Sequence, residues 1–439
     1  MTIGRKQRIN PSLTKAFICS ILVAIGAGFC CLGQAVESTA PPAGDSDFEE
    51  LPELQASEIL KPEFVKGPHF TVREPVPTSS GMNKFSIDSE YGVFEADGNA
   101  MLVQRVGEIV AIAQLKEVSR TDQFKQSLVS AAKGPYHAAK NVVEDPGGAV
   151  SNAGKGLMKF MKRTGNTIKN VSKGTAEKSS DGNKAQQIIG YTRAKRQVAA
   201  KLGVDPYSTN SVLQKELDGI AWASWGGGFT FSAATFPISG PAGLALTATS
   251  VSKTVGQLIN EKTATELKAI NRSALRTAGV SANDAERFLE NSAFTPTHQT
   301  AFSMNLKSLE GVANRGAFVH AAAEKSTSEA DAIFCVQTLD LLGSVHAGEH
   351  PLARILMLES FPIGIAKDGT VVVALQWDYA AWTPRAAAFA DEIAKVADES
   401  GGHKPVLVAI SGQASTRLQQ EFANRKITLH DRVSPGPLK

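Results

Sequence analysis

Near the C-terminus, two apolar runs at 371–377 and 405–411 each end in polar residues whose types could bind a small ligand. These polar residues are Asp378 and Tyr379 after the first run, and Ser411, Gly412 and Ser415 at the end of the second. In open α/β sheets ligands bind beyond the carboxyl ends of the strands, and N–H groups at the start of a helix can hold an anion. The five residues form our candidate ligand site. The alternative is that 411–415 is an ordinary glycine turn followed by a serine cap.

A second pattern, H-x-x-E-H, could provide zinc ligands. It consists of His346, Glu349 and His350, and an inverted zinc-protease site needs these side chains on one helical face. Gly348 lies inside the pattern and Pro351 follows it directly, so we expect a loop at the exit of a helix and no metal site. A weaker, noncatalytic metal contact through His346 and His350 is the alternative.

Other motifs that would identify an enzyme are absent or incomplete. Five residues separate Gly148 from Gly154 where a phosphate-binding loop has four, and Gly156 stands where that loop needs Ser or Thr. The sequence has no G-x-S-x-G elbow, C-x-x-C pair or calcium loop. We therefore expect no cofactor, although these absences do not rule out an enzyme.

The first 35 residues have the order of a secretory signal peptide. Four cationic residues precede the uncharged apolar run 16–32, and Gly33 and Ala35 supply small residues at positions −3 and −1 of a cleavage site. We expect cleavage after Ala35 and export to the periplasm or the outside of the cell. An uncleaved, membrane-associated anchor is the alternative, although the run is just short of the roughly 20 residues that span a bilayer easily. Phe29 stands where a lipoprotein signal needs a small residue, which argues against lipidation.

Without this segment the chain is nearly neutral. Removing its four cationic residues changes the formal net charge from +3 to −1. A global basic character that would indicate nucleic acid binding is therefore absent, and we expect no nucleic acid partner. Of the four cysteines only Cys335 remains, so no internal disulfide can form. Cys335 lies in an apolar run and is typical of a buried thiol that packs as a small hydrophobe.

The segment 146–201 is strongly basic. In its first part, basic residues surround apolar ones, a pattern that can lie on an anionic membrane surface. The residues of this hypothesis are Lys155, Lys159, Phe160, Lys162 and Arg163. The middle, 170–183, is rich in Ser, Gly and Lys, which indicates a flexible linker. A solvated linker throughout is the alternative for the whole segment.

The remaining patterns predict an α+β chain that is mainly helical. Residues 36–66 are acidic, with Pro and Ala, and predict a disordered linker. Residues 67–145 combine strand-like alternation with a helix at 99–118, which predicts an N-terminal β/α portion. Residues 202–345 predict a central helical region. It includes an apolar, glycine-rich stretch at 219–252, which we expect to be a buried hairpin because each arm is too short to span a membrane comfortably.

Residues 346–439 predict a small C-terminal α/β module. The runs 371–377 and 405–411 are rich in Val, Ile, Leu and Ala without clean alternation, which is typical of strands buried on both faces. A helix at 383–398 supplies the crossover that parallel pairing requires. We predict that these strands are parallel neighbours whose carboxyl ends bring the candidate ligand site together.

These features favour an exported, noncatalytic envelope or interaction protein. Its expected partner is an unknown protein or envelope component, and peripheral contact with anionic lipid is a further expectation. The competing interpretation is an exported hydrolase with its site in the C-terminal module. No catalytic motif supports the second interpretation, and a fold class alone does not identify a function.

Overall fold

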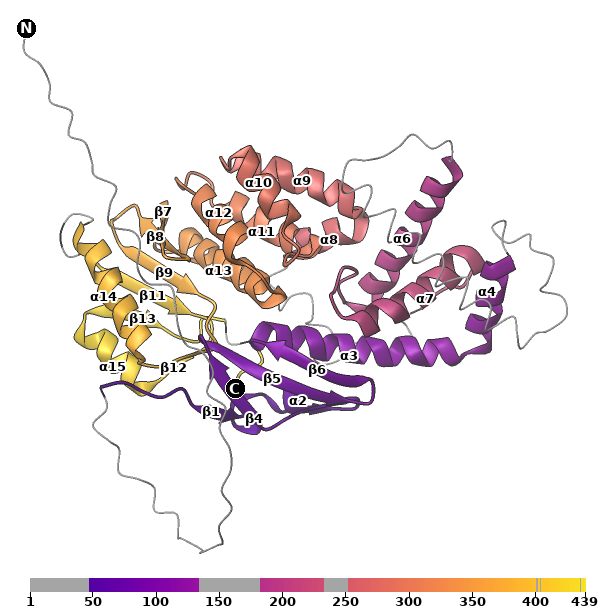
Figure 1. Cartoon of the computed structure of the whole chain (residues 1–439), viewed down its shortest axis with the longest axis horizontal. Helices are drawn as coiled ribbons and strands as arrows, with labels where there is room; N and C mark the ends of the chain where they lie inside the picture. The colour runs from indigo at the N-terminus through magenta and orange to yellow at the C-terminus, as the bar shows by residue number, and fades with distance from the viewer. Residues whose placement is uncertain (1–46, 134–181, 233–251, 400–401, 403, 435) are drawn as a thin grey trace, which may run out of the picture. The chain divides into compact units, whose positions relative to one another are not determined.

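Two β-sheets and a set of helices make up the fold (Figure 1). The computed structural model describes residues 47–133, 182–232, 252–399, 402, 404–434 and 436–439. Along the chain, a sheet near the N-terminus is followed by helices and then by a second sheet with its own helices. Residues Phe48–Lys439 belong to one unit. The predicted α+β, mainly helical class is confirmed.

The N-terminal sheet is built on β5 (Met82–Ser89), in which buried and more exposed side chains alternate. β5 pairs antiparallel with β3, β4 and β6, while β1 and β2 extend the sheet at its edges. Alternation allows one face to pack Phe85 and Ile87 into a core shared with α3 (Asn99–Arg120). The other strands are β1 (Glu53–Gln55), β2 (Lys66–Gly67), β3 (Phe70–Val72), β4 (Pro75–Ser79) and β6 (Gly92–Asp97).

The segment that leads into this sheet and supplies its strand β1 is ordered, so the predicted linker at 36–66 is wrong from residue 48 onward. It contains β1 and two single-turn helices, α1 (Ala56–Ile59) and α2 (Pro62–Val65). Ala56, Leu60 and Phe64 are buried in the core of the sheet. The acidic composition indicated disorder, but three apolar side chains four residues apart are enough to anchor the segment.

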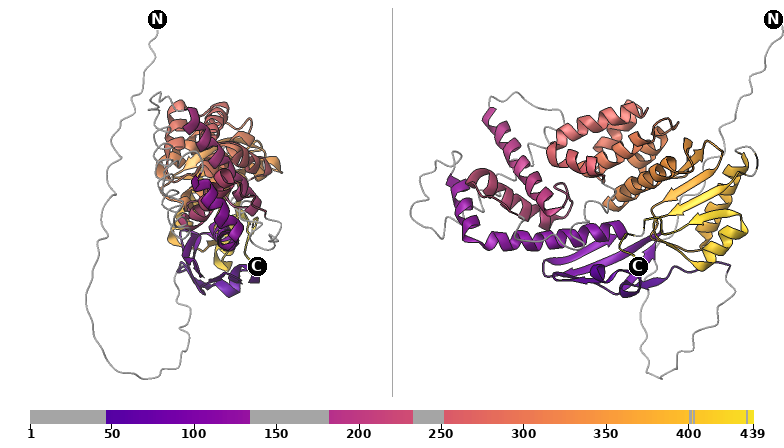
Figure 2. Two further views of the ribbon diagram at one scale, coloured as in Figure 1. Left: turned by 90° about the vertical axis from the view of Figure 1, so that its right-hand side faces the viewer. Right: turned by 180° about the vertical axis from the view of Figure 1, so that it is seen from behind.

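The helices of the middle of the chain form two groups, which Figure 2 shows from behind. α4 and α6 both pack on α7, and α4 and α7 also contact α3. The helices from α8 to α13 share a core that includes Phe288, Phe302 and Phe318. None of the helices in the described residues is long and apolar enough to cross a membrane. Their bounds are α4 (Asp122–Lys133), α6 (Gly182–Leu202), α7 (Ser211–Gly227), α8 (Lys253–Glu261), α9 (Ala264–Thr277), α10 (Ala282–Glu290), α11 (Pro296–Ser308), α12 (Gly316–Lys325) and α13 (Glu329–Ala347).

The basic segment ends in a helix rather than in a linker. α6 buries Tyr191, Val198 and Leu202 against α7 and its neighbours, so its last part has an apolar face among the basic residues. The many basic residues of the segment made this apolar face hard to recognise from composition. Most of the basic segment, at 134–181, and part of the apolar stretch, at 233–251, lie outside the described residues.

A buried charge network fixes the middle of α3. Arg105 Nη1 donates to Glu108 Oε2 at 2.9 Å, and its Nη2 donates to Glu329 Oε2 at the start of α13 at 2.5 Å. Glu108 also accepts from Ser208 and from Asn210 Nδ2 in the loop before α7. The network therefore joins three segments that are far apart in the sequence.

The C-terminal sheet has the strand order β13-β11-β9-β8-β7. β9 (Val371–Leu375) and β11 (Val406–Ile410) are parallel neighbours, as predicted, and every residue of both strands is buried. Burial on both faces explains why neither run alternates in the sequence. The other strands of this region are β7 (Leu352–Leu358), β8 (Phe361–Ala366), β10 (Tyr379–Ala380), β12 (Gln413–Ala414) and β13 (Ile427–His430).

Helices cover both faces of this sheet (Figure 1). α14 (Pro384–Glu399) and α15 (Thr416–Asn424) share a core with one face, which includes Val373 and Val408. Val372 and Ala374, which point the other way, pack with α13. α14 connects β9 to β11 and is the predicted crossover helix.

Candidate functional site

The carboxyl ends of β9 and β11 bring together the two groups of residues predicted from the sequence. Just after the strands, Gly412 N donates to Trp377 O at 2.7 Å, and Gln413 N donates to Asp378 O at 2.9 Å. β10 and β12 continue the parallel pairing with Tyr379 opposite Gln413. Both groups therefore lie on one edge of the C-terminal region, as the polarity of parallel strands requires.

Part of this edge is closed by the chain itself. A β-carbon on Gly412 would lie 2.1 Å from the Asp378 carbonyl oxygen, so glycine is needed for the close approach of two backbones. Ser415 caps α15, because its Oγ accepts from Leu418 N at 3.0 Å and donates to Glu49 Oε2 at 2.6 Å. The polar groups of Gly412 and Ser415 are engaged within the protein, which favours the turn-and-cap alternative at these two residues.

Asp378 is buried, with 2% of its surface exposed. Its Oδ2 accepts from the backbone N–H groups of Asn83 and Asn99, both at 3.0 Å, and its Oδ1 accepts from Gln376 Nε2 at 3.1 Å. Burial raises the pKa of Asp378 to about 7, and the hydrogen bonds that it accepts oppose this rise. Because Asn99 is the first residue of α3, the carboxyl group also lies at the positive end of that helix.

A cavity of about 260 Å³ adjoins Asp378. Asn99 from α3, Gln376 from the end of β9 and Ser411 from the end of β11 line it together with Asp378. Gln376 is 2% exposed, and its Oε1 has no hydrogen-bond partner in the part of the chain that the structure describes. A buried acceptor without a donor costs roughly 1–3 kcal/mol. The other lining residues are Phe64, Ala100, Val103, Gln337, Asp340, Leu341, Ser434, Gly436 and Pro437.

The lining of this cavity is acidic. Asp340 and Asp378 contribute carboxyl groups, and none of the described lining residues is Lys, Arg or His. Ser411 Oγ donates its proton to Trp377 O at 2.8 Å, so toward a ligand it can act only as an acceptor. The cavity therefore combines two carboxyl groups with amide and hydroxyl groups.

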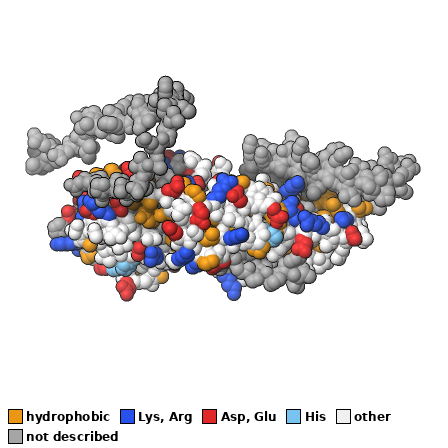
Figure 3. Space-filling model, turned by 90° about the horizontal axis from the view of Figure 1, so that it is seen from below, with side chains coloured by type: hydrophobic (Ala, Val, Ile, Leu, Met, Phe, Trp, Pro, Cys, Tyr) orange, Lys and Arg blue, Asp and Glu red, His pale blue; other side chains and the backbone are white. Residues whose placement is uncertain are grey.

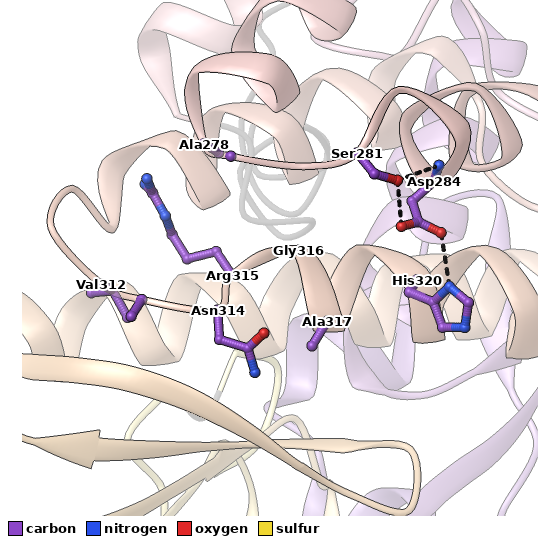
Figure 4. A pocket seen from close by; sticks show the side chains of 11 residues that line it. Ala278, Ser281, Asp284, Val312, Asn314, Arg315, Gly316, Ala317 and His320 are labelled. Atoms are coloured by element: carbon purple, nitrogen blue, oxygen red, sulfur yellow. Dashed lines mark hydrogen bonds and ion pairs between the residues drawn. The ribbon is translucent and has the colours of Figure 1, made fainter. Parts of the chain in front are cut away.

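A second cavity, of about 450 Å³, lies between the start of α10 and the start of α12 (Figure 4). Asp284 Oδ1 pairs with His320 Nδ1 at 2.8 Å, and Asp284 Oδ2 accepts from Ser281 Oγ at 2.6 Å. In a serine hydrolase the serine donates to the histidine, which acts as its base. Here Ser281 donates to the carboxylate and caps α10 instead, so the three side chains do not form a nucleophile and its base.

The histidine pattern straddles the end of α13, so only its part from Gly348 onward is the loop that was expected. His346 is in the last turn of the helix, where its Nδ1 accepts from Leu352 N at 2.9 Å, and His350 Nδ1 lies 3.5 Å from Asp368 Oδ2. Glu349 is exposed beyond the helix end. Among the described residues, no group of three His, Cys, Asp or Glu side chains is arranged to hold a metal ion.

The residues proposed for a membrane surface lie outside the described part of the chain, as does the segment 1–35. They are Lys155, Lys159, Phe160, Lys162 and Arg163. On the face drawn in Figure 3, basic and acidic side chains of the described residues are intermixed. Both membrane contact and export therefore stay predictions.

Comparison with known proteins adds no constraint, because no family model, curated protein or solved structure matches this chain. The site is therefore interpreted from its geometry. Sequence reasoning missed two of its residues, Gln376 and Asn99. Gln376 gave a visible signal as an amide at the end of an apolar run, since such groups are seldom buried without partners. Asn99 gave none, because its place beside Asp378 depends on how α3 and the C-terminal sheet pack.

Proposed function

We propose that this chain is an exported, noncatalytic binding protein whose cavity at the carboxyl ends of β9 and β11 takes a small polar ligand. The observation that carries the proposal is the cavity itself, which lies at the carboxyl ends of β9 and β11 and is lined by Asn99, Gln376 and Asp378. Ligands of open α/β sheets bind at this edge. The volume of about 260 Å³ lies just below the usual range of roughly 300–1,000 Å³ for ligand pockets, which suits a small molecule.

The arrangement of the serines supports a noncatalytic role. A serine nucleophile needs a base within hydrogen-bond reach of its hydroxyl group. Ser411, beside the cavity, donates to a backbone carbonyl, and Ser281, in the second cavity, donates to Asp284. The competing hydrolase with its site in the C-terminal module would need a nucleophile that Ser411 does not provide in this arrangement.

Ligand-observed NMR with a mixed library of small polar compounds tests the binding function. We expect compounds that bind the wild-type protein and lose binding when Ala100→Leu or Ser434→Phe fills the cavity from two different segments. Ala317→Leu, which places the same bulk in the second cavity, is the matched control and should leave binding unchanged. Binding that no filling substitution affects, or ester hydrolysis that depends on Ser411, would contradict the proposal.

Export is supported by the order of cationic, apolar and small residues in 1–35. Intact mass of the mature protein should correspond to a chain that begins at Val36. A mature protein that retains Met1 to Ala35 would argue for a membrane anchor. Changing Ala35 to a bulky residue should block cleavage if the predicted site is correct.

Peripheral membrane contact is proposed for the basic segment near Lys155 to Arg163, because each basic residue near an anionic surface contributes about 1 kcal/mol. Vesicle flotation should show binding to vesicles that contain phosphatidylserine and weaker binding as salt rises. Replacing Lys155, Lys159 and Lys162 by Gln should reduce binding. Equal flotation with neutral vesicles would favour the solvated linker.

A further inference from the structure

We propose that the loop 205–210, which we call the junction loop, is a pH-sensitive latch that joins α6 and α7 to α3, α11 and α13. The latch holds when the buried carboxyl group of Asp205 is protonated and loosens when that group ionises. The loop connects α6 to α7, so its contacts decide how firmly these two helices are held. This device is independent of the cavity beside Asp378.

The polar side chains of the junction loop bind three separate helices. Three hydrogen bonds make these contacts: Asp205 with Thr297 on α11, Ser208 with Glu108 on α3, and Thr209 with Glu329 on α13. Thr297 Oγ1 donates to Asp205 Oδ1 at 2.6 Å, and Thr209 Oγ1 donates to Glu329 Oε2 at 2.5 Å. Because α6 and α7 flank the loop, these bonds connect one helix group of the middle of the chain to the other.

The carboxyl groups around the junction loop outnumber the cations that compensate them. Arg105 pairs with both Glu108 and Glu329. Among the described residues Asp205 has no ion-pair partner, and its carboxylate accepts from two neutral donors, Thr297 Oγ1 and Tyr207 N. An ionised Asp205 would add a third negative charge to a group that has one arginine. Burying a charge without a cation is costly, so this arrangement favours a neutral Asp205.

The proton on Asp205 is bound more tightly when the loop is closed. Burial raises the pKa of Asp205 to about 7, and the charges of Glu108 and Glu329 contribute to this rise. The hydrogen bonds from Thr297 and Tyr207 oppose it. An open loop returns the carboxyl group to water, where its pKa is 3.8. Opening therefore releases the proton, and it becomes easier as pH rises from about 4 to about 7.

Other charged and titratable groups lie around the junction loop and its partners. They are Arg105 and Glu108 on α3, Arg196 on α6, Lys262 before α9, Glu266 on α9, His298 on α11 and Glu329 on α13. Burial lowers the pKa of His298 to about 4, and burial raises the pKa of Tyr207 to about 12, so both side chains are neutral between pH 5 and pH 8. Asp205 is therefore the group that we expect to change its charge in this range.

Hydrogen exchange of the whole mature protein between pH 5 and pH 8 tests the latch. Tyr207 N donates to Asp205 Oδ1 and Asn210 N donates to Ser208 Oγ, so these amides are protected only while the loop is closed. Their protection factors, corrected for the intrinsic exchange rate at each pH, should fall up to about tenfold per pH unit and level off above about pH 7. At every pH the loop should be less protected than β9 and β11, which exchange by larger openings.

Substitutions assign the titration to one carboxyl group. Asp205→Asn keeps the shape of the side chain but cannot ionise, so loop protection should stay within about twofold from pH 5 to pH 8. Asp378→Asn is the matched control, because it removes another buried carboxyl whose pKa burial raises to about 7, and it should leave the loop profile unchanged. Thr297→Val removes a donor that lowers the pKa of Asp205, so the levelling should move to higher pH. This shift decides the role of Asp205 if Asp205→Asn does not fold.

Three results would overturn the latch. Corrected protection factors of the loop that stay constant from pH 5 to pH 8 in the wild-type protein would show that no proton controls its opening. A wild-type profile in Asp205→Asn, or an unshifted profile in Thr297→Val, would remove Asp205 from the mechanism. Equal protection of the loop and of β9 and β11 at every pH would show that the loop opens only when the whole protein unfolds.

Discussion

Helix α3 meets buried carboxyl groups at two points, and their surroundings differ. At its middle, Glu108 and Glu329 are compensated by Arg105 and accept further hydrogen bonds from the loop before α7. At its start, Asp378 accepts from neutral donors and adjoins a cavity that Gln376 also lines. Buried polar groups that the protein satisfies completely fix the packing of its elements. A carboxyl with a perturbed pKa beside open volume is where a ligand is expected instead.

The largest effect is expected from breaking the compensated site. Arg105→Met leaves the buried Glu108 and the partly buried Glu329 without this cation, which should lower the free energy of unfolding by about 3–5 kcal/mol. Urea denaturation followed by tryptophan fluorescence measures this loss. Arg73→Met, the control, removes an arginine from a half-exposed pair with Asp88 and should change stability little. Equal losses in both variants would show that the buried network does not hold α3.

The uncompensated site should make stability depend on pH. Burial raises the pKa of Asp378 from 3.8 to about 7, so the folded protein binds this proton more tightly than the unfolded chain does. The resulting stabilisation is fully present below about pH 4 and is lost as pH rises through about 7. Its size is at most roughly 4 kcal/mol, since each pH unit between the two pKa values corresponds to about 1.4 kcal/mol.

Asp205 provides an internal comparison for this prediction. Burial also raises its pKa to about 7, and its carboxylate accepts from Thr297 Oγ1 at 2.6 Å and from Tyr207 N at 2.8 Å. Asp378→Asn should therefore reduce the fall in unfolding free energy between pH 4 and pH 8, and Asp205→Asn should reduce it by a similar amount. Denaturation curves at several pH values decide this, and a profile that Asp378→Asn leaves unchanged would contradict the assignment.

The smallest effect on stability is expected at Gln376. Gln376→Leu removes the donor to Asp378 but also removes the unpartnered Oε1, and these opposing changes should leave the free energy of unfolding within about 1 kcal/mol of wild type. Gln104→Leu should cost more, because Gln104 Nε2 donates to Glu108 at 3.2 Å and to Glu329 at 3.3 Å within the charge network. Thermal denaturation of both variants provides the measurement. A larger loss at Gln376 would make its amide structural and weaken the contrast between the two sites.

The spacing of apolar residues correctly predicted the helices and strands in which that spacing is regular or the apolar run is long. The helix expected at 99–118 is α3, and the strands expected at 371–377 and 405–411 are β9 and β11 in the predicted parallel pairing. Cys335 is buried, and burial raises the pKa of its thiol to about 12, as expected of a cysteine that packs as a small hydrophobe.

Prediction from the local sequence failed for short elements and for helices whose apolar face is interrupted by many charged residues. α12 begins after Arg315, whose side chain makes no cap hydrogen bond, so no start signal marked this helix. α6 hides its apolar residues among lysines and arginines. The segment before β3 is acidic, yet Leu60 pairs with Leu438 from the other end of the chain. A contact between residues so far apart along the chain cannot be predicted from the local sequence.

By itself, the sequence determined the class of the fold and the edge on which the C-terminal residues meet, because apolar periodicity and strand polarity are local properties of the chain. Only the tertiary structure decided which polar groups at that edge are hydrogen-bonded within the protein. Asp378 is 279 residues from Asn99, whose N–H it accepts, and that hydrogen bond exists only once α3 packs beside β9. Contacts with Glu49 and Leu418 satisfy Ser415, whereas Gln376 Oε1 has no donor among the described residues. Whether a polar group is satisfied depends on every neighbour in space, and the spacing of residues along the chain does not record those neighbours.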